Sequence, residues 1–317
     1  MGENIYINGL VSVVIPTFNN ASCIKECIES TQSQTYANIE IIVIDDGSSD
    51  NTENVVKSLQ SKYSNIVYKK IQNSKSPIAR NTGFALAQGE YVCAIDADDI
   101  WPDYKLEMQV AVLKANSNSI VLGEVQGFTV DPNGQKVWGE ILNLPTADTK
   151  EHYLDSVMRM KLEQMVMFNT FMAPTKIIQE DGLWNPDVVT AHDWENWIRL
   201  AKKFNFVHVN TVFQYYRKHD SSTTKKHKKF QALFFQLYVI NLHSKDNSWS
   251  WHDALDYKRI RYDSWVRIYL YEKAFFDACK LMSKAIVDSN MAFSLRGARL
   301  IVEFFAALLR SKLLGKR

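Results

Sequence analysis

Short apolar runs of strand length alternate with longer amphipathic segments along the first part of the chain. The apolar runs are rich in Val and Ile, which favour strands, whereas the segments between them repeat apolar residues at helical spacing. Alternation of this kind predicts parallel strands connected by helices in a doubly wound α/β sheet. The pattern predicts strands near residues 11–15, 39–44, 66–70, 91–95 and 119–130, and helices near 21–33, 51–62, 77–88 and 103–115.

The pattern is less regular after residue 130. Residues 131–134, Asp-Pro-Asn-Gly, predict a hairpin turn that leads into a strand at 135–139. A polar and then basic run at 221–229 marks a boundary, and an aromatic-rich helical region follows it. Between the hairpin and this boundary we expect a helix near 149–160, a strand at 165–172, a helix at 193–203 and a last strand at 206–213.

Three of the predicted strands end in polar turns, at residues 16–20, 45–50 and 96–99. Ligands of doubly wound sheets bind beyond the carboxyl ends of the strands, so the three turns are expected along one rim. The last turn has three carboxylates in four positions, which repel one another unless a cation lies among them. Hard divalent cations prefer such oxygen ligands and commonly carry phosphate. The alternative is a solvated turn in which Asp99 caps a helix starting near Pro102.

Composition limits the classes of protein that fit this pattern. A 317-residue chain with 46% hydrophobic residues can bury a large core, as one domain or as one domain with an appendage. The net charge of +2 predicts no nucleic-acid partner. Four cysteines without metal-ligand or disulfide spacing indicate reduced thiols and a cytoplasmic protein. We expect neither a signal peptide nor a membrane span, because no apolar run reaches about 18 residues.

The polar turns and their flanking strands resemble the inverting glycosyltransferases of family 2, which have the GT-A fold. Nine segments carry the resemblance, in the expected order: Val11–Asn19, Ser33–Tyr36, Glu40–Thr52, Ala79–Gly83, Gly89–Tyr91, Asp96–Trp101, Gly182–Trp184, Asp193–Ala201 and Tyr216–His219. Beyond about Phe230 we find no family pattern.

The resemblance implies an α/β protein with a doubly wound mixed sheet and a C-terminal helical appendage. The expected domains are a GT-A domain at 1–225 and a helical region at 226–317. Within the first, a nucleotide-binding half covers about 10–115 and an acceptor half about 116–225.

By the same resemblance, carboxylates are expected to hold the nucleotide of a nucleotide-sugar donor. Asp46 would accept hydrogen bonds from the base and Asp96 from the ribose hydroxyls. The alternative for Asp46 is a residue that caps the following helix, and Asp45 is expected to support the turn. The donor would also contact Pro16, Thr17, Arg80 and Ala97. For Arg80 the alternative is a surface residue in the first turn of a helix.

The resemblance also implies a bound Mn²⁺ or Mg²⁺ that bridges the diphosphate oxygens. Asp98 is the expected ligand, and His219 matches a position near the metal or diphosphate, although a histidine in a basic loop is often only solvated. Asp99 would assist the metal site or, as we favour, cap the following helix. Arg217 and Lys225 are candidates for contacts with acceptor or phosphate.

Asp193 is the candidate general base, because it matches the acidic residue of the family at the start of a helix. Its alternative role is an N-cap. The family usually has Glu-Asp here, whereas this chain has His192-Asp193. The departure leaves three roles open for His192: contact with the acceptor, a share in proton transfer, or capping of the helix.

The last residues predict an amphipathic helix, with a tail at about 294–317 that has Phe and Leu on one side and Arg and Lys along its edge. Such a helix suits a membrane interface, and the alternative is packing against protein. The expected function is metal-dependent, inverting transfer of one sugar from a UDP-hexose, glucose or galactose, to a hydroxyl of a glycan. The expected acceptor is polyprenyl-diphosphate-linked, in O-antigen or capsule synthesis at the inner face of the cytoplasmic membrane.

Two other classes of protein compete with this interpretation. A glycoside hydrolase needs only two carboxylates that flank the scissile bond and no apparatus for a diphosphate. A non-catalytic nucleotide-sugar-binding or membrane-adaptor protein on the same fold would keep its function after Asp193→Asn.

Overall fold

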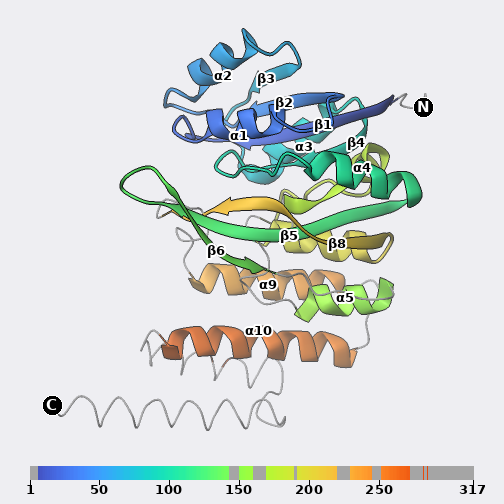
Figure 1. Cartoon of the computed structure of the whole chain (residues 1–317). Helices are drawn as coiled ribbons and strands as arrows, with labels where there is room; N and C mark the ends of the chain where they lie inside the picture. The colour runs from blue at the N-terminus through green and yellow to red at the C-terminus, as the bar shows by residue number, and fades with distance from the viewer. Residues whose placement is uncertain are drawn as a thin grey trace, which may run out of the picture. The chain divides into compact units, whose positions relative to one another are not determined.

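The structure is a computed structural model that describes residues 6–142, 150–159, 169–188, 191–219, 229–244, 251–271, 281 and 284 (Figure 1). The chain clusters into two compact units, Met1–Lys225 and Lys226–Arg317. In the second unit, α9 (Lys229–His243) and α10 (Trp251–Tyr271) contact each other, and Trp265 Nε1 donates to Gln236 Oε1 at 3.0 Å. The predicted amphipathic tail at 294–317 lies outside the described residues. Among the described helices, none combines the length and apolar character needed to span a bilayer.

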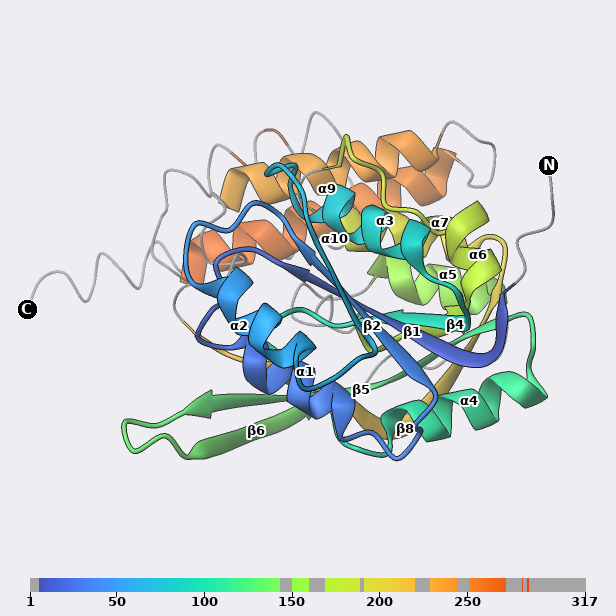
Figure 2. The ribbon, with the colours of Figure 1, turned by 90° about the horizontal axis from the view of Figure 1, so that it is seen from above.

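The first unit is built on one mixed, eight-stranded sheet with the spatial order β3-β2-β1-β4-β7-β5-β6, and β8 pairs with β5. Its first four strands are parallel, as the sequence pattern predicts: β1 (Ile7–Thr17), β2 (Ile39–Asp45), β3 (Ile66–Lys70) and β4 (Gly89–Ala94). The connecting helices are α1 (Ile24–Gln32), α2 (Thr52–Gln60), α3 (Ser76–Leu86) and α4 (Lys105–Ala115). Figure 2 shows α3 along one side of these strands and α1 and α4 along the other, so this half is doubly wound.

The rest of the sheet is mixed. The predicted hairpin joins β5 (Ser119–Val130) to β6 (Lys136–Leu142), and β8 (Asn205–Arg217) runs parallel to β5. Helices α5 (Lys150–Arg159) and α7 (His192–Ala201) lie close to their predicted positions.

The strand predicted at 165–172 is wrong at residues 169–171, and residues 165–168 lie outside the described residues. Residues 169 and 170 form a 3₁₀ turn, and β7 (Met172–Pro174) begins only at Met172, where it pairs antiparallel with β4. Asn169 in this turn donates a hydrogen bond to Asp96. Helix α6 (Thr175–Glu180), which follows β7 directly, was not predicted.

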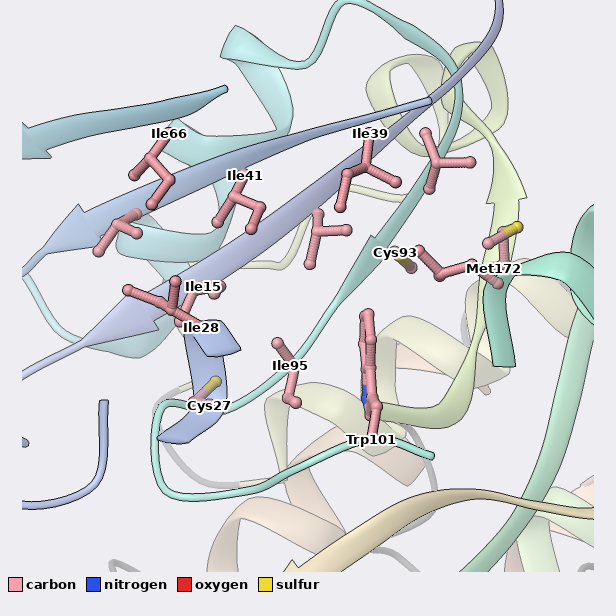
Figure 3. Close-up of a cluster of buried hydrophobic side chains, with 14 of the residues drawn as sticks. Ile15, Cys27, Ile28, Ile39, Ile41, Ile66, Cys93, Ile95, Trp101 and Met172 are labelled. Carbon is pink, nitrogen blue, oxygen red and sulfur yellow. The ribbon is translucent and has the colours of Figure 1, made fainter. Parts of the chain in front are cut away.

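Side chains on both faces of β1 are buried against helices, which fixes the position of this strand in the sheet. On one face, Ile15 and Ile41 pack with Ile28 of α1 and with Trp101 in a cluster from which water is excluded (Figure 3). On the other face α3 approaches closely, since a Cβ at Gly83 would overlap Val14 Cγ1. The strand register then places Thr17 opposite Asp45, so the ends of β1 and β2 lie side by side.

Lys105 at the start of α4 is a buried cation. Its side chain is 0% exposed, its Nζ lies 4.0 Å from the ring centroid of Trp101, and it donates to Gln109 Oε1 at 2.5 Å. Burial lowers the pKa of Lys105 to about 8 from 10.5. Because no carboxylate compensates among the contacts of the described residues, this charge costs folding free energy at neutral pH.

We therefore expect wild-type stability to rise relative to that of Lys105→Met as the pH increases from about 8 to 10.5. Over this range the unfolded chain binds the proton more tightly, so the free energy of unfolding increases with pH, by up to about 3 kcal/mol. Urea unfolding of both proteins at several pH values measures the difference. The exposed Lys114→Met on the same helix is the control, and equal pH dependence of Lys105→Met and wild type would contradict the assignment.

Candidate active site

Asp46, directly after β2, ties three segments of the rim together. Its N–H donates to Thr17 O at 2.8 Å, and its two carboxylate oxygens accept from the N–H groups of Ser74 (2.7 Å) and Lys75 (2.9 Å). The alternative that Asp46 caps the next helix is therefore wrong, since its partners lie in the loop before α3. Burial raises the pKa of Asp46 despite these two hydrogen bonds.

The adjacent residues have different environments. Asp45 supports the turn, as predicted, because its carboxylate accepts from Ser48 N (2.7 Å) and Tyr68 Oη (2.6 Å). Pro16 lies in β1 opposite Ile44 and is buried. Thr17 Oγ1 is also buried, and it has no hydrogen-bond partner among the described residues. A buried hydroxyl at the carboxyl end of a central strand marks a place where a ligand can supply the missing bond.

Asp96, after β4, lies at the centre of a second cluster. Arg80 Nη2 donates to Asp96 Oδ1 at 2.5 Å, and Asn169 Nδ2 donates to Oδ2 at 2.7 Å. Arg80 lies in α3 and is 3% exposed, so the alternative of a surface arginine is wrong. The pKa of Asp96 is raised, because burial and the carboxylates of Asp98 and Asp193 outweigh the effects of Arg80 and Asn169.

Asp99 has a role that differs from the favoured prediction. Helix α4 begins at Lys105 and has no side-chain cap, whereas the Asp99 carboxylate accepts from Gln214 Nε2 (2.5 Å) and from Arg217 N (2.9 Å). Asp99 is 1% exposed, and burial together with its acidic neighbours raises its pKa well above the usual range. It therefore joins the acidic turn to β8 instead of capping a helix.

Arg217, at the end of β8, strengthens the same connection. Its Nε donates to Asp98 O at 2.7 Å, its Nη2 donates to Glu26 of α1, and its guanidinium lies 4.7 Å from the ring centroid of Phe128. Through these contacts, the Arg217 side chain, which is only 11% exposed, connects β8 to the acidic turn and to α1. The predicted contact of Arg217 with acceptor or phosphate stays a prediction.

Asp98 and His219 are brought together by this tie. Asp98 Oδ2 lies 2.9 Å from His219 Nε2, and the two side chains are 25% and 28% exposed. No cluster of three or more acidic, His or Cys side chains that could hold an ion occurs within the described ranges. The Asp98–His219 pair nevertheless fits a divalent ion, because neighbouring ligands of an octahedral ion with bonds of ~2.1 Å lie ~3.0 Å apart. The remaining positions of such an ion suit water and phosphate oxygens.

Asp193 approaches the Asp96 cluster from the first turn of α7. Its Oδ1 accepts from Trp184 Nε1 at 2.7 Å, and its Oδ2 lies 3.5 Å from His192 Nε2. The N-cap alternative is wrong for both residues, because Ala191 precedes the helix and no side chain caps it. Ala191 has a left-handed φ of 67°, which alanine rarely adopts, so the surrounding structure determines this turn.

Electrostatics keeps Asp193 ionised. Burial alone would raise its pKa, but His192, Arg80 and the hydrogen bond from Trp184 lower it below its usual value. Trp184 is itself fixed, because its backbone N and O exchange hydrogen bonds of 2.7 and 2.8 Å with the side chain of Asn81, and its ring stacks on Phe84 at 5.1 Å. An ionised carboxylate in a rigid position can accept a proton.

Several residues of these clusters were not predicted. Trp184 carried a signal, because it belongs to one of the segments of resemblance, but its hydrogen bond to Asp193 did not follow from the sequence. Asn169, Gln214 and Glu26 carried none. Ala97, between Asp96 and Asp98 in the sequence of the acidic turn, is buried, and Lys225 lies outside the described residues.

The fold and the rim together define a class of protein. A doubly wound sheet with carboxylates at the ends of β2 and β4, and an ionised Asp193 beside them, is typical of enzymes that bind a nucleotide diphosphate. Residues 12–172 match the family described as Glycosyl transferase family 2. The chain belongs to this family.

Two curated bacterial proteins are similar over most of the chain. An uncharacterized glycosyltransferase of Rickettsia typhi, RT0329, is 29% identical over 224 residues, which cover 71% of this chain and 68% of the relative. The Escherichia coli protein WfgD, named as a UDP-Glc:alpha-D-GlcNAc-diphosphoundecaprenol beta-1,3-glucosyltransferase, is 29% identical over 235 residues, covering 73% of this chain and 85% of the relative.

A solved structure supports the fold. The mannosyltransferase PcManGT from Pyrobaculum calidifontis, in complex with GDP-Man and Mn²⁺, has a TM-score of 0.56 at 17% identity and covers 94% of this chain and 80% of that chain. The predicted GT-A fold is therefore confirmed, and the protein is a glycosyltransferase by family.

Proposed function

We propose that the protein transfers one sugar, with inversion, from a UDP-hexose to a hydroxyl of a lipid-linked glycan. The observation that carries the proposal is the position of ionised Asp193 beside the Arg80–Asp96 pair at the carboxyl ends of the strands. A donor held at Asp96 would lie next to an ionised carboxylate that can accept a proton.

The donor would occupy the rim across the carboxyl ends of β2, β1 and β4. Asp46 and the buried hydroxyl of Thr17 border the expected place of the base, and Asp96 with Ala97 that of the ribose. UDP is favoured because WfgD is named for UDP-Glc. Glucose or galactose remains the expected sugar.

Asp98 and His219 are the residues that would hold Mn²⁺ or Mg²⁺ next to the diphosphate, and PcManGT was solved with Mn²⁺. A divalent ion at this position would neutralise the charge that grows on the leaving group. Asp96 and Asp99 are less suited as ligands, because both of their carboxylate oxygens accept hydrogen bonds within the protein.

The chemical step would be a single displacement. Asp193 Oδ2 takes the proton of the acceptor hydroxyl, while the oxygen of that hydroxyl forms a bond to the anomeric carbon of the sugar. On the opposite side of that carbon, the bond to the diphosphate oxygen breaks and its electron pair leaves with UDP. The Trp184 hydrogen bond to Oδ1 holds the carboxylate so that Oδ2 is presented to the acceptor.

The acceptor class is proposed from likeness alone. WfgD is named for a diphosphoundecaprenol-linked GlcNAc, so a polyprenyl-diphosphate-linked sugar in O-antigen or capsule synthesis is the favoured acceptor. Such a lipid lies in a membrane, and we propose that the enzyme works at the inner face of the cytoplasmic membrane, with the tail at 294–317 as a peripheral anchor.

Ligand-dependent melting tests the donor site without an acceptor. A ligand that binds only the folded state raises the melting temperature with its concentration. We expect one of a panel of UDP-, GDP- and dTDP-sugars, most readily a UDP-hexose, to raise it in a manner that requires Mn²⁺. No shift with any donor would contradict the proposal.

A further inference from the structure

The carboxylate of Asp96 is held by side chains from two different segments. Arg80 of α3 donates through Nη2 to Oδ1, and Asn169, in the turn before β7, donates through Nδ2 to Oδ2 at 2.7 Å. Each carboxylate oxygen therefore accepts one hydrogen bond. Rotation of the carboxylate about its bond to Cβ would break both hydrogen bonds, so the two donors together fix its plane.

The turn that carries Asn169 is anchored in the core. Thr170 is 0% exposed, and its carbonyl accepts from Gln109 Nε2 of α4 at 2.8 Å. The ring of Phe171 lies 6.2 Å from the ring of Phe84, centroid to centroid. Phe84 belongs to α3, the helix that supplies the other donor to the carboxylate. The two donors are therefore positioned by segments that pack against each other.

The fixed carboxylate can still accept hydrogen bonds from a ligand. A carboxylate has about four lone-pair sites, and the bonds from Arg80 and Asn169 use two of them. The Asp96 side chain is 36% exposed, so a ligand can reach it. The 2′- and 3′-hydroxyls of a ribose offer two donors to the two oxygens, and both bonds form together only when the carboxylate plane is oriented toward the diol.

We propose that Asn169 is a positioning residue that, by fixing the plane of Asp96, lets the site select ribonucleotides over 2′-deoxyribonucleotides. The inference rests on the proposed function, in which Asp96 binds the ribose of the donor. A 2′-deoxyribose keeps only the 3′-hydroxyl, and a single hydrogen bond can follow a carboxylate that rotates. A hydrogen bond to a charged acceptor contributes about tenfold to a hundredfold in affinity, which sets the expected size of the preference.

Nucleotide binding without turnover tests the inference. UDP and 2′-deoxy-UDP are titrated, each with Mn²⁺, into the wild type, Asn169→Leu and Asn169→Ala, and calorimetry gives the dissociation constants. Both substitutions remove the donor to Asp96, but leucine fills the space of the amide and alanine empties it. We expect the wild type to bind UDP about tenfold or more tightly than 2′-deoxy-UDP. In both variants UDP should bind more weakly and 2′-deoxy-UDP almost as before, so that the two affinities become nearly equal.

The ratio of the two affinities separates positioning from simple packing. Asn133→Leu, in the exposed turn between β5 and β6, is the control and should keep the wild-type ratio. Melting temperatures without nucleotide verify that the variants fold. An equal loss of affinity for both nucleotides would indicate a structural role and overturn the inference, as would an unchanged ratio.

The wild type alone provides a further check. Equal binding of UDP and 2′-deoxy-UDP by the wild type would overturn the inference and leave the proposed sugar transfer intact. Binding of neither nucleotide would contradict the UDP donor of the proposed function, and the inference would fail with it.

Discussion

Asp193→Asn is expected to lower kcat by about 10²- to 10⁴-fold, the usual contribution of a general base. The amide oxygen of asparagine can still accept from Trp184 Nε1, so the side chain should keep its position. What is lost is the ability to take the proton of the acceptor hydroxyl. Steady-state assays with saturating donor and acceptor measure the effect, and the donor-dependent melting shift should remain.

The same substitution at Asp187 provides a matched control. Asp187 is exposed and precedes α7 by only a few residues. Asp187→Asn should therefore retain wild-type kcat. Normal turnover in Asp193→Asn would assign the base to another residue, and loss of donor binding in that variant would indicate a structural role.

Asp98→Ala should abolish metal-dependent transfer while the fold remains intact. In the acidic turn, the carboxylates of Asp96 and Asp99 each accept hydrogen bonds from amide or guanidinium groups. The structure gives no such donor for Asp98, whose carboxylate contacts His219. The substitution therefore removes the carboxylate that is best placed to bind an ion. His219 alone offers one ligand, so affinity for Mn²⁺ should fall and the melting shift with UDP-sugar should no longer depend on the ion. Titration of Mn²⁺ against the melting shift and against the initial rate measures both effects.

Asp103→Ala is the control for this change, since Asp103 is an exposed carboxylate just beyond the acidic turn. It should bind Mn²⁺ and donor as the wild type does. Full metal-dependent turnover in Asp98→Ala would remove Asp98 from the metal site.

The alternating half of the sheet could be predicted because its determinants are local. Strands β1 to β4 are short Val- and Ile-rich runs separated by amphipathic helices, and each signal lies within its own element. The polar turn that follows each strand then falls on the rim through the topology of parallel strands alone. The positions of Asp46 and Asp96 therefore followed from sequence.

The contacts across the rim could not be predicted, because they join residues far apart in the chain. Asp99 was expected to cap a neighbouring helix, a local role, but its partners Gln214 and Arg217 lie on β8. Strand β7 is only three residues long and has no periodic signal of its own. It pairs antiparallel with β4 and with β5, which are distant in the chain. Asn169, a few residues before it, donates to Asp96.

Product analysis tests the central claim most directly. The protein is incubated with Mn²⁺, the UDP-hexose selected by the melting panel, and a polyprenyl-diphosphate-linked GlcNAc, and the anomeric configuration of the product is determined by NMR. The account predicts one added sugar with a β linkage from an α-linked donor, and no such product with Asp193→Asn. A product of retained configuration, or UDP release without any extended glycan, would contradict it.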